Sequence, residues 1–240
     1  MSLTINHQTD DISNLTGAVT FNGVAVGGDN TPVYFFGSRG IFAGGYSSGG
    51  PDNAIDYITI ASTGNATDFG DLTVARNQAP ASMSNGTRGV FAGGRTSTPV
   101  NTIDYITVAN TGNATDFGDL TVARLQAAGA SNGTTGLIIA GNSSAISART
   151  DVEKITIATT GNATSYSGTT SSAQSCTGWS NKDRAIFAIG YTGSARSNTM
   201  EFLSYATEGN ATDFGDLTVV RNNHSATGNT TRMLVVGGDT

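Results

Sequence analysis

The sequence repeats itself over long distances, and this repetition restricts its fold more than any other feature. The phrase TGNATDFGDLTVAR stands at residues 63–76 and again, unchanged, at residues 111–124, and GNATDFGDLTVVR follows at residues 209–221. A degenerate copy, TGNATSYSGTTSS, occupies residues 160–172. The period is about 48 residues. A period of this length predicts a chain built from equal structural units that pack against one another.

Each unit contains four short strand candidates separated by turn signals. In the second unit they are a small-residue segment at 79–84, GVFAGG at 89–94, IDYITV at 103–108 and DFGDLTVAR at 116–124. The turn signals are SNGT, the Gly doublet with its loop, and TGNAT. Four strands in roughly 40–50 residues are typical of a β-propeller blade, and no stretch shows helical spacing. We therefore predict an all-β propeller whose first strands, rich in Ala, Ser and Gly, lie nearest the axis.

The spacing predicts five blades. Counting in steps of about 48 residues gives blades at about 29–76, 77–124, 125–173 and 174–221, with residues 222–240 left over. Those residues would supply the first two strands of a fifth blade, and residues 1–28 the other two, so that the closing blade is shared between the termini. Residues 1–28 do not match the repeat, and the alternative is a short attachment module. The predicted domains are residues 1–28 and a propeller at residues 29–240.

Two resemblances follow from these letters. GVFAGG, IDYITVA and DFGDLTVAR together resemble the kelch repeat, in which an apolar strand ends in Gly-Gly and an aromatic residue precedes a terminal Arg. The match is partial, because Phe69, Phe117 and Phe214 stand where kelch repeats carry Trp. The phrase TGNATDFGDLTVAR and the leader MSLTINHQTDDISN resemble structural proteins of tailed phages. That resemblance implies a virion protein of the tail-fibre, appendage or head-decorating type, made in the host cytoplasm.

Composition argues against several partners. The net charge of −6, with no run of Lys or Arg, argues against nucleic acid and against an anionic membrane surface. No long apolar stretch or signal-peptide pattern occurs, so we expect no membrane insertion. The lone Cys176 excludes an internal disulfide. The NAT sequons are interpreted as turn residues and not as glycosylation sites; they lie at Asn65, Asn113, Asn162 and Asn210.

The residues that catalysis or a cofactor would need are scarce. Some kelch propellers are copper oxidases, but a copper or zinc centre needs several imidazole or thiolate ligands. This chain offers only His7, His224 and Cys176. His224 precedes Ser225, yet one such pair is a weak signal for a hydrolase, and we interpret His224 as a polar residue at the start of an inner strand. We predict no enzyme activity and no cofactor.

The repeated acids form the only metal candidates. Carboxylates three residues apart beside a Gly could contribute to a Ca²⁺ site, but such a pair supplies few of the six to eight oxygens that Ca²⁺ takes. The alternative is that each Asp accepts backbone N–H groups and shapes a turn. We favour the alternative, because repeat three lacks the pair. The weak candidates are Asp68, Asp71, Asp116, Asp119, Asp213 and Asp216. The terminal Arg of each repeat is predicted to reach an Asp or a carbonyl of the adjacent blade.

The repeats differ most in the loops between their second and third strands. These loops read YSSGGPDN, RTSTPVN, NSSAISARTD and YTGSARSN, and they share one face of the propeller. Binding residues concentrate on variable loops of rigid scaffolds, although loops also drift without consequence. The candidates for stacking on, or hydrogen bonding to, a sugar or protein are Tyr46, Arg95, Arg149, Tyr191 and Arg196.

Three functions fit this reading. The first is a non-enzymatic virion protein that contacts other virion proteins, a host-surface glycan or a receptor, with self-association as a further option. The second is a lectin-like module that binds carbohydrate between blades. The third, an enzyme acting on polysaccharide, is disfavoured because no acid pair breaks the repeat pattern.

Overall fold

The computed structural model describes residues 5–6, 11–12, 19–21, 24–26, 38–78 and 80–240. The chain divides into two compact units, Met1–Tyr34 and Phe35–Thr240. In the first unit, two pairs of strands run antiparallel: β1 (Ile5–Asn6) with β2 (Asp11–Ile12), and β3 (Val19–Phe21) with β4 (Val24–Val26). The role predicted for residues 1–28 falls largely outside the described residues. No helix among the described residues is long and apolar enough to cross a membrane.

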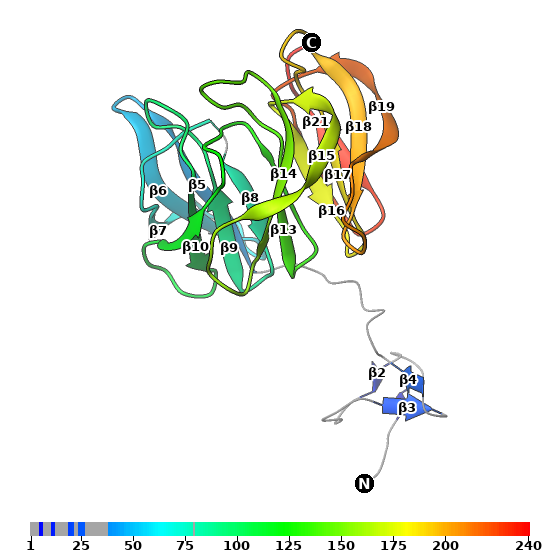
Figure 1. The fold of residues 1–240 in the computed structure, drawn as a ribbon. Helices are drawn as coiled ribbons and strands as arrows, with labels where there is room; N and C mark the ends of the chain where they lie inside the picture. Colours follow the sequence, from blue (N-terminus) through cyan, green and yellow to red (C-terminus); the bar gives the residue numbers. More distant parts are fainter. Residues whose placement is uncertain (1–4, 7–10, 13–18, 22–23, 27–37, 79) are drawn as a thin grey trace. The chain divides into compact units, whose positions relative to one another are not determined.

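The second unit is all-β and consists of antiparallel sheets that follow one another in sequence order (Figure 1). The described residues of blade 1 form three strands: β5 (Arg39–Ser47), β6 (Gly50–Thr59) and β7 (Thr67–Asp71). Blades 2 and 3 have four strands each: β8 (Ala81–Ser84), β9 (Arg88–Ala92), β10 (Thr102–Thr107) and β11 (Thr115–Asp119), then β12 (Ala128–Ser131), β13 (Thr135–Ile139), β14 (Arg149–Thr156) and β15 (Thr164–Ala173). Blade 4 comprises β16 (Thr177–Ser180), β17 (Arg184–Ala188), β18 (Ser197–Ser204) and β19 (Thr212–Arg221).

The propeller arrangement is confirmed, but the prediction of five blades is wrong. The described residues form four blades and a two-stranded hairpin, β20 (Ser225–Gly228) with β21 (Met233–Val236). The hairpin corresponds to the first two strands of a repeat, as predicted from residues 222–240. The count of residues had also assigned residues 1–28 to this fifth blade. Residues 1–28 contain no Arg and no Phe-Gly pair, two features of the repeats in blades 1, 2 and 4.

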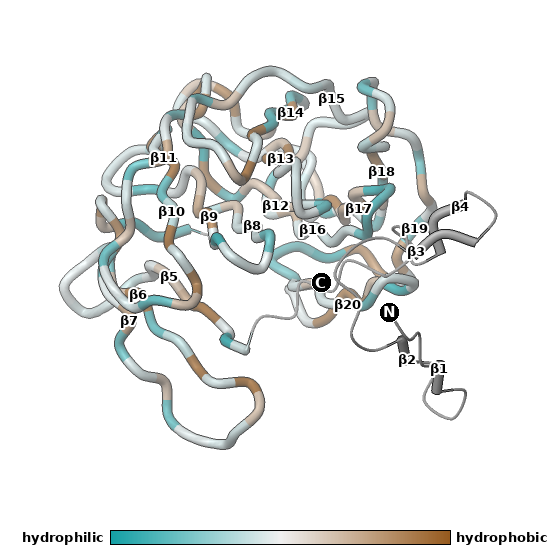
Figure 2. The backbone as a smooth tube through the Cα atoms, turned by 90° about the horizontal axis from the view of Figure 1, so that it is seen from below, coloured by the Kyte–Doolittle hydropathy of each residue, from teal (hydrophilic) through white to brown (hydrophobic). Residues whose placement is uncertain are grey.

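The innermost strands explain why small residues recur there. β8, β12, β16 and β20 lie side by side near the centre of Figure 2. A Cβ atom on Gly129 would lie 2.3 Å from the carbonyl oxygen of Ser82 on the neighbouring strand, and one on Gly178 would lie 2.7 Å from the oxygen of Gly129. At these two positions even the Cβ of Ala would force the strands apart, which confirms the predicted crowding at the axis.

Apolar clusters fill the spaces between consecutive blades. Phe69 of blade 1 packs with Phe91 of blade 2, and Phe117 of blade 2 packs with Ile138 of blade 3. The repeated Phe of blades 1 and 2 therefore packs between consecutive blades. Each Phe also meets an aromatic ring of its own blade edge to face; Tyr105 and Phe117 have centroids 6.0 Å apart at 80°.

The repeated DFG sequence encodes a β-bulge. In blade 2, Ile103 pairs with Gly118 while the next residue, Asp104, pairs with Asp116, so Phe117 is the extra residue. The same irregularity occurs at the equivalent position of the other three blades. The bulge turns the repeated acids outward as exposed residues, so Asp68 and Asp71 flank a bulge within a strand and not a turn.

The repeated TGNAT sequence joins one blade to the next, which corrects its interpretation as a simple turn. The N–H groups of Gly112 and Ala114 donate to the carbonyl oxygens of Phe69 and Asp71 on the preceding blade, each over 2.7 Å. The side-chain oxygen of Asn113 accepts the N–H of Asp71 at 3.1 Å. Asn162 and Asn210 make the equivalent bond to blades 2 and 3. Asparagine therefore repeats here because its amide bridges two blades.

A second joint lies deeper and involves charge. Arg76 ends the repeat of blade 1, and its Nη2 lies 2.8 Å from Oδ2 of Asp104 in blade 2, with both side chains fully buried. Thr73 of blade 1 donates its hydroxyl to the same carboxylate at 2.5 Å. In blade 3, Glu153 pairs with Arg124 and accepts the backbone N–H of Thr121 at 2.8 Å. We call this Thr–Arg–carboxylate set the acid clamp. The predicted contact of the terminal Arg is confirmed, although it is buried and not at the surface.

Blade 3 lacks the arginine of the clamp. Ala173 stands at that position, and Glu201 of blade 4 is held by the hydroxyl and the N–H of Thr170, the latter at 2.9 Å. Glu201 is fully buried nonetheless. The carboxylate position of the third strand is therefore retained even where its cation is lost.

Candidate functional site

The loops between second and third strands form the candidate site. They connect β5 to β6, β9 to β10, β13 to β14 and β17 to β18. Antiparallel alternation places them on one face of the propeller, together with the segments that lead from each fourth strand to the next blade. Their sequences do not repeat, whereas the SNGT turns of the opposite face are fixed by one recurring bond pattern. There, Asn85 Oδ1 accepts the N–H groups of Thr87 and Arg88.

The loop after β9 carries Arg95 at the surface. Its backbone pairs with Asn77 on one side and Pro99 on the other, so the residue sits in a small local ladder. Its Nε donates to the carbonyl oxygen of Ser97 at 3.2 Å. The guanidinium is therefore oriented by its own loop, and its remaining N–H groups form no other hydrogen bond to the described residues.

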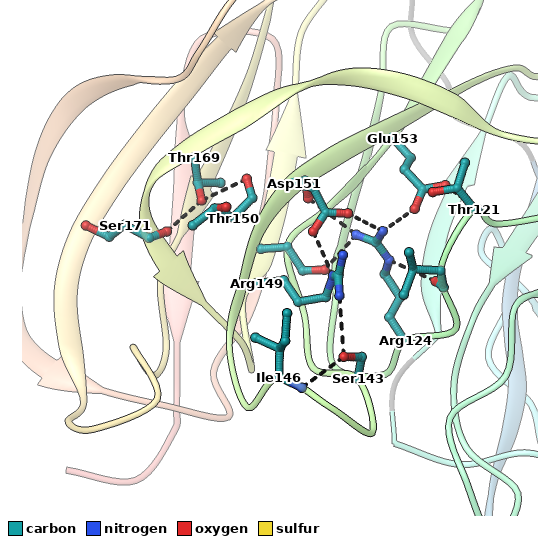
Figure 3. Close-up of polar contacts among 12 residues, drawn as sticks. Thr121, Arg124, Ser143, Ile146, Arg149, Thr150, Asp151, Glu153, Thr169 and Ser171 are labelled. Atoms are coloured by element: carbon teal, nitrogen blue, oxygen red, sulfur yellow. Dashed lines mark hydrogen bonds and ion pairs between the residues drawn. The ribbon is translucent and has the colours of Figure 1, made fainter.

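The loop after β13 is stabilised by Ser143 and Arg149. Ser143 Oγ accepts the N–H of Ile146 at 3.2 Å and a bond from Arg149 Nη1 at 3.4 Å (Figure 3). Arg149 also donates from Nε to Asp151 Oδ1 at 2.7 Å. Ile146 is half-exposed at the loop tip. Arg149 thus acts as a brace beneath the loop, and its availability for a ligand is lower than the sequence suggested.

Asp151 links this brace to the acid clamp. Figure 3 shows the guanidinium of Arg124 between Asp151 and Glu153, with Nη2 at 2.5 Å from Asp151 Oδ2. Burial by itself would raise the pKa of Asp151, but hydrogen bonds and positive charge from Arg149 and Arg124 outweigh burial and lower that pKa. Asp151 is ionised at neutral pH, and the loop is therefore anchored to a buried charge network.

A groove of about 520 Å³ lies between the loops of blades 2 and 3. Its size falls in the range of small-molecule sites. The polar groups are a guanidinium, amide and hydroxyl groups, and the apolar ones include an isoleucine and a proline. Its lining includes Arg95, Ser97, Thr98, Asn142, Ser143 and Ile146. The side-chain amide of Asn142 is held in place, because its Nδ2 donates a hydrogen bond to Oε1 of Gln174 at 2.8 Å.

The structure distributes the five candidate binding residues over three places. Arg95 lines the groove and Arg149 braces the loop on its other side. Tyr46 is exposed at the end of β5 in blade 1. Tyr191 and Arg196 pair through their backbones in the loop of blade 4, where Arg196 Nε donates to Asn222 at 3.1 Å. The sequence therefore placed its candidates on the face that carries the groove but missed Asn142 and Ser143, whose contribution depends on how the loop folds back.

A second cavity, of about 530 Å³, follows the propeller axis between the inner strands. Ala, Ser and Gly provide most of its lining, together with Cys176, Trp179 and His224. Burial raises the pKa of Cys176 to about 12, so its thiol is protonated and a poor nucleophile at neutral pH. Burial lowers the pKa of His224, and the charge of Arg221 lowers it further. His224 is buried at the start of an inner strand, which confirms the position predicted for it.

The three acid pairs that were weak calcium candidates lie on separate blades and face solvent. Asp213 accepts the N–H of Gly215 at 3.2 Å, a local contact of the kind expected for a backbone-shaping residue. Within the part of the chain that the structure describes, no group of three or more His, Cys, Asp or Glu side chains is arranged to hold a metal ion.

Comparison with known proteins found no protein-family profile that matches this chain and no match among curated proteins. The resemblances to kelch repeats and to tailed-phage structural proteins therefore stay predictions. The observations that bear on function are the propeller scaffold, its non-repeating loop face and the groove between blades 2 and 3.

Proposed function

We propose that this protein is a non-enzymatic structural and adhesion component of a tailed-phage virion. In this proposal the propeller is a rigid support, and its variable loops contact another virion protein or the host surface. The observation that carries the proposal is the groove of about 520 Å³, which lies among the loops whose sequences differ from repeat to repeat. The virion assignment itself rests on the resemblance of the TGNATDFGDLTVAR phrase.

The construction beneath the groove supports a binding role. Binding residues work best when packed elements hold them in place. Here the loop at Ser143 is tied through Arg149 and Asp151 to the buried Arg124. The loop at Arg95 begins at Gly93–Gly94, where the N–H of Gly94 donates to the carbonyl oxygen of Arg124 at 2.8 Å. Both walls of the groove therefore rest on one buried arginine.

Two experiments test the proposal at different levels. Mass spectrometry of purified particles of the virus that encodes the chain should detect the protein at a fixed copy number, and its absence would refute the virion assignment. Adsorption of the purified protein to host cells should fall at least about tenfold for Arg95→Ala, a loss of roughly 1.4 kcal/mol. The matched control is Arg232→Ala, which removes an exposed arginine on the opposite face. Equal losses for both variants would refute a role for the groove.

The composition of the groove favours a second candidate, a lectin-like module. Hydroxyl, amide and guanidinium groups beside apolar surface are the chemistry that binds sugars, and the groove lies between two blades as the sequence suggested. A glycan array made from host surface polysaccharides tests this candidate. Glycan binding that is lost in Asn142→Ala supports the lectin-like candidate. An array without any signal refutes it, and contact with another protein is then the function proposed for the groove.

A further inference from the structure

The acid clamp has a fixed register on the second strand of each blade. In blade 2 the carboxylate residue Asp104 pairs with Phe91 of the second strand. In blade 3 the pair is Glu153 with Ile138, and in blade 4 it is Glu201 with Phe187. A third strand therefore always brings a carboxylate opposite the same position of the second strand, where the preceding blade can bind it.

After blade 4 the clamp is half built. Arg221 Nη1 donates to the carbonyl oxygen of Gly237 at 3.1 Å, as Arg124 Nη1 does to Ala140 at 3.0 Å one blade earlier. The position equivalent to Phe91 and Ile138 is Val235 in β21. Among the described residues, however, β21 pairs only with β20, and no carboxylate forms an ion pair with Arg221. Arg221 is therefore placed to pair with a carboxylate on a third strand next to β21, and the described residues provide no such strand.

The apolar surface beside this clamp is also uncovered. Phe214 is 46% exposed, whereas the equivalent Phe69 and Phe117 are each 2% exposed beneath the next blade. In β21, Leu234 and Val236 are 57% and 52% exposed on the face that points away from blade 4. A row of unpaired N–H and C=O groups bordered by apolar side chains is a template for strand pairing.

We propose that the edge of β21 is a docking site for a β-strand of another protein, with Asp or Glu opposite Val235. The incoming carboxylate completes the clamp with Arg221 and with the N–H of Thr218, the equivalent of Thr121 in blade 2. Backbone hydrogen bonds to β21 supply affinity, and the carboxylate fixes the register. A second copy of this chain is a poor donor, because its matching strands β10, β14 and β18 are already central in four-stranded sheets. The inference concerns a surface distinct from the loop groove and does not depend on the proposed function.

The test uses the full chain and a synthetic peptide with the sequence of residues 101–110, which contains β10 and Asp104. A labelled peptide should bind with a Kd measurable by fluorescence anisotropy, and the Asp104→Asn peptide should bind about ten- to a hundredfold more weakly, since a hydrogen-bonded charge is lost. In the Arg221→Gln protein the two peptides should bind equally, because the coupling requires both groups.

Hydrogen exchange locates the site on the same complex. Binding should slow amide exchange in β21 and leave the exposed edge strand β11 of blade 2 unchanged. Three results would each overturn the inference: no binding of the acidic peptide, equal binding of the two peptides to the unmodified protein, or protection confined to residues outside β20 and β21. Because the peptide comparison leaves the protein unaltered, it does not depend on how well the Arg221→Gln variant folds.

Discussion

Replacing Asp104 by Asn tests the acid clamp, because it removes one charge of a buried pair while keeping the side-chain volume. Both Arg76 and Asp104 are fully buried and 2.8 Å apart. Burial lowers the pKa of Arg76 and the carboxylate of Asp104 opposes that shift, so the ion pair offsets the cost of removing the guanidinium from water. Without the carboxylate, its other contacts are the carbonyl oxygens of Phe91 and Thr102.

Breaking such a pair from one side costs about 3–5 kcal/mol, because an uncompensated charge is left in the interior. Total stability of a domain is roughly 5–15 kcal/mol, so the loss is about a fifth of it or more. For a unit of this size, 1 kcal/mol corresponds to about 2–4 °C in Tm. The expected decrease for Asp104→Asn is therefore about 6–20 °C.

Urea unfolding followed by the fluorescence of Trp179, the single tryptophan, measures the free energy of unfolding of the second unit. Asp56→Asn is the matched control, since Asp56 has the same position in blade 1 but is exposed, and we expect a change within about 0.5 kcal/mol. The double variant Arg76→Met with Asp104→Leu should recover most of the loss, because neither charge is then buried. Equal effects of Asp104→Asn and Asp56→Asn would refute the reasoning.

Three further predictions follow from other parts of the joints. Gly118→Ala should lower the free energy of unfolding in urea by at least about 1 kcal/mol more than Gly215→Ala does. A Cβ on Gly118 would lie 2.6 Å from backbone atoms of Gly161, whereas a Cβ on Gly215, which is also at positive φ, would meet open space. Equal losses for the two variants would contradict this close approach between blades. Because the pKa of Asp151 is lower in the folded than in the unfolded protein, its ionised carboxylate stabilises the fold above the unfolded pKa of about 3.9, and this stability is lost as the pH falls through the lower folded pKa. The free energy of unfolding should therefore fall less with decreasing pH in Asp151→Asn than in the unmodified protein. Identical acid-unfolding curves for the two proteins would contradict this role of Asp151. With a thiol pKa of about 12, the partly buried Cys176 should react slowly with a thiol reagent at neutral pH and faster as the pH rises; reaction at neutral pH as fast as that of an ordinary exposed thiol would contradict the raised pKa.

Much of the fold could be predicted because the repeat records it several times. The strand order within the blades, the packing of Phe117 and the small residues at the axis all follow from period and composition. The blade count did not follow, because it depended on residues 1–28, which do not match the repeat consensus. Simple arithmetic on length carried no information about whether those residues pair with β21.

Some of the contacts between blades were missed from the sequence because the same residue type can have two structural roles. Asn in a Gly-rich segment is a turn signal, and Asn85 behaves as one, yet Asn113 bridges two blades. A signal for the acid clamp was present, since Asp104, Glu153 and Glu201 recur at the same position of each third strand and match the arginines that end the repeats. The groove left no such signal, because its shape depends on loop residues that occur only once in the chain.

Amide hydrogen exchange along the TGNAT segments tests the central claim that the repeated phrase joins blades. The N–H groups of Gly112, Ala114 and Ala163 donate to the preceding blade, whereas those of Gly64 and Ala66 in the first copy donate to no backbone carbonyl of the described residues. Nuclear magnetic resonance should therefore show strong protection at the first three and little at Gly64 and Ala66. Fast exchange at all five sites, near unfolded rates, would show that TGNAT is a solvated turn and would contradict the account.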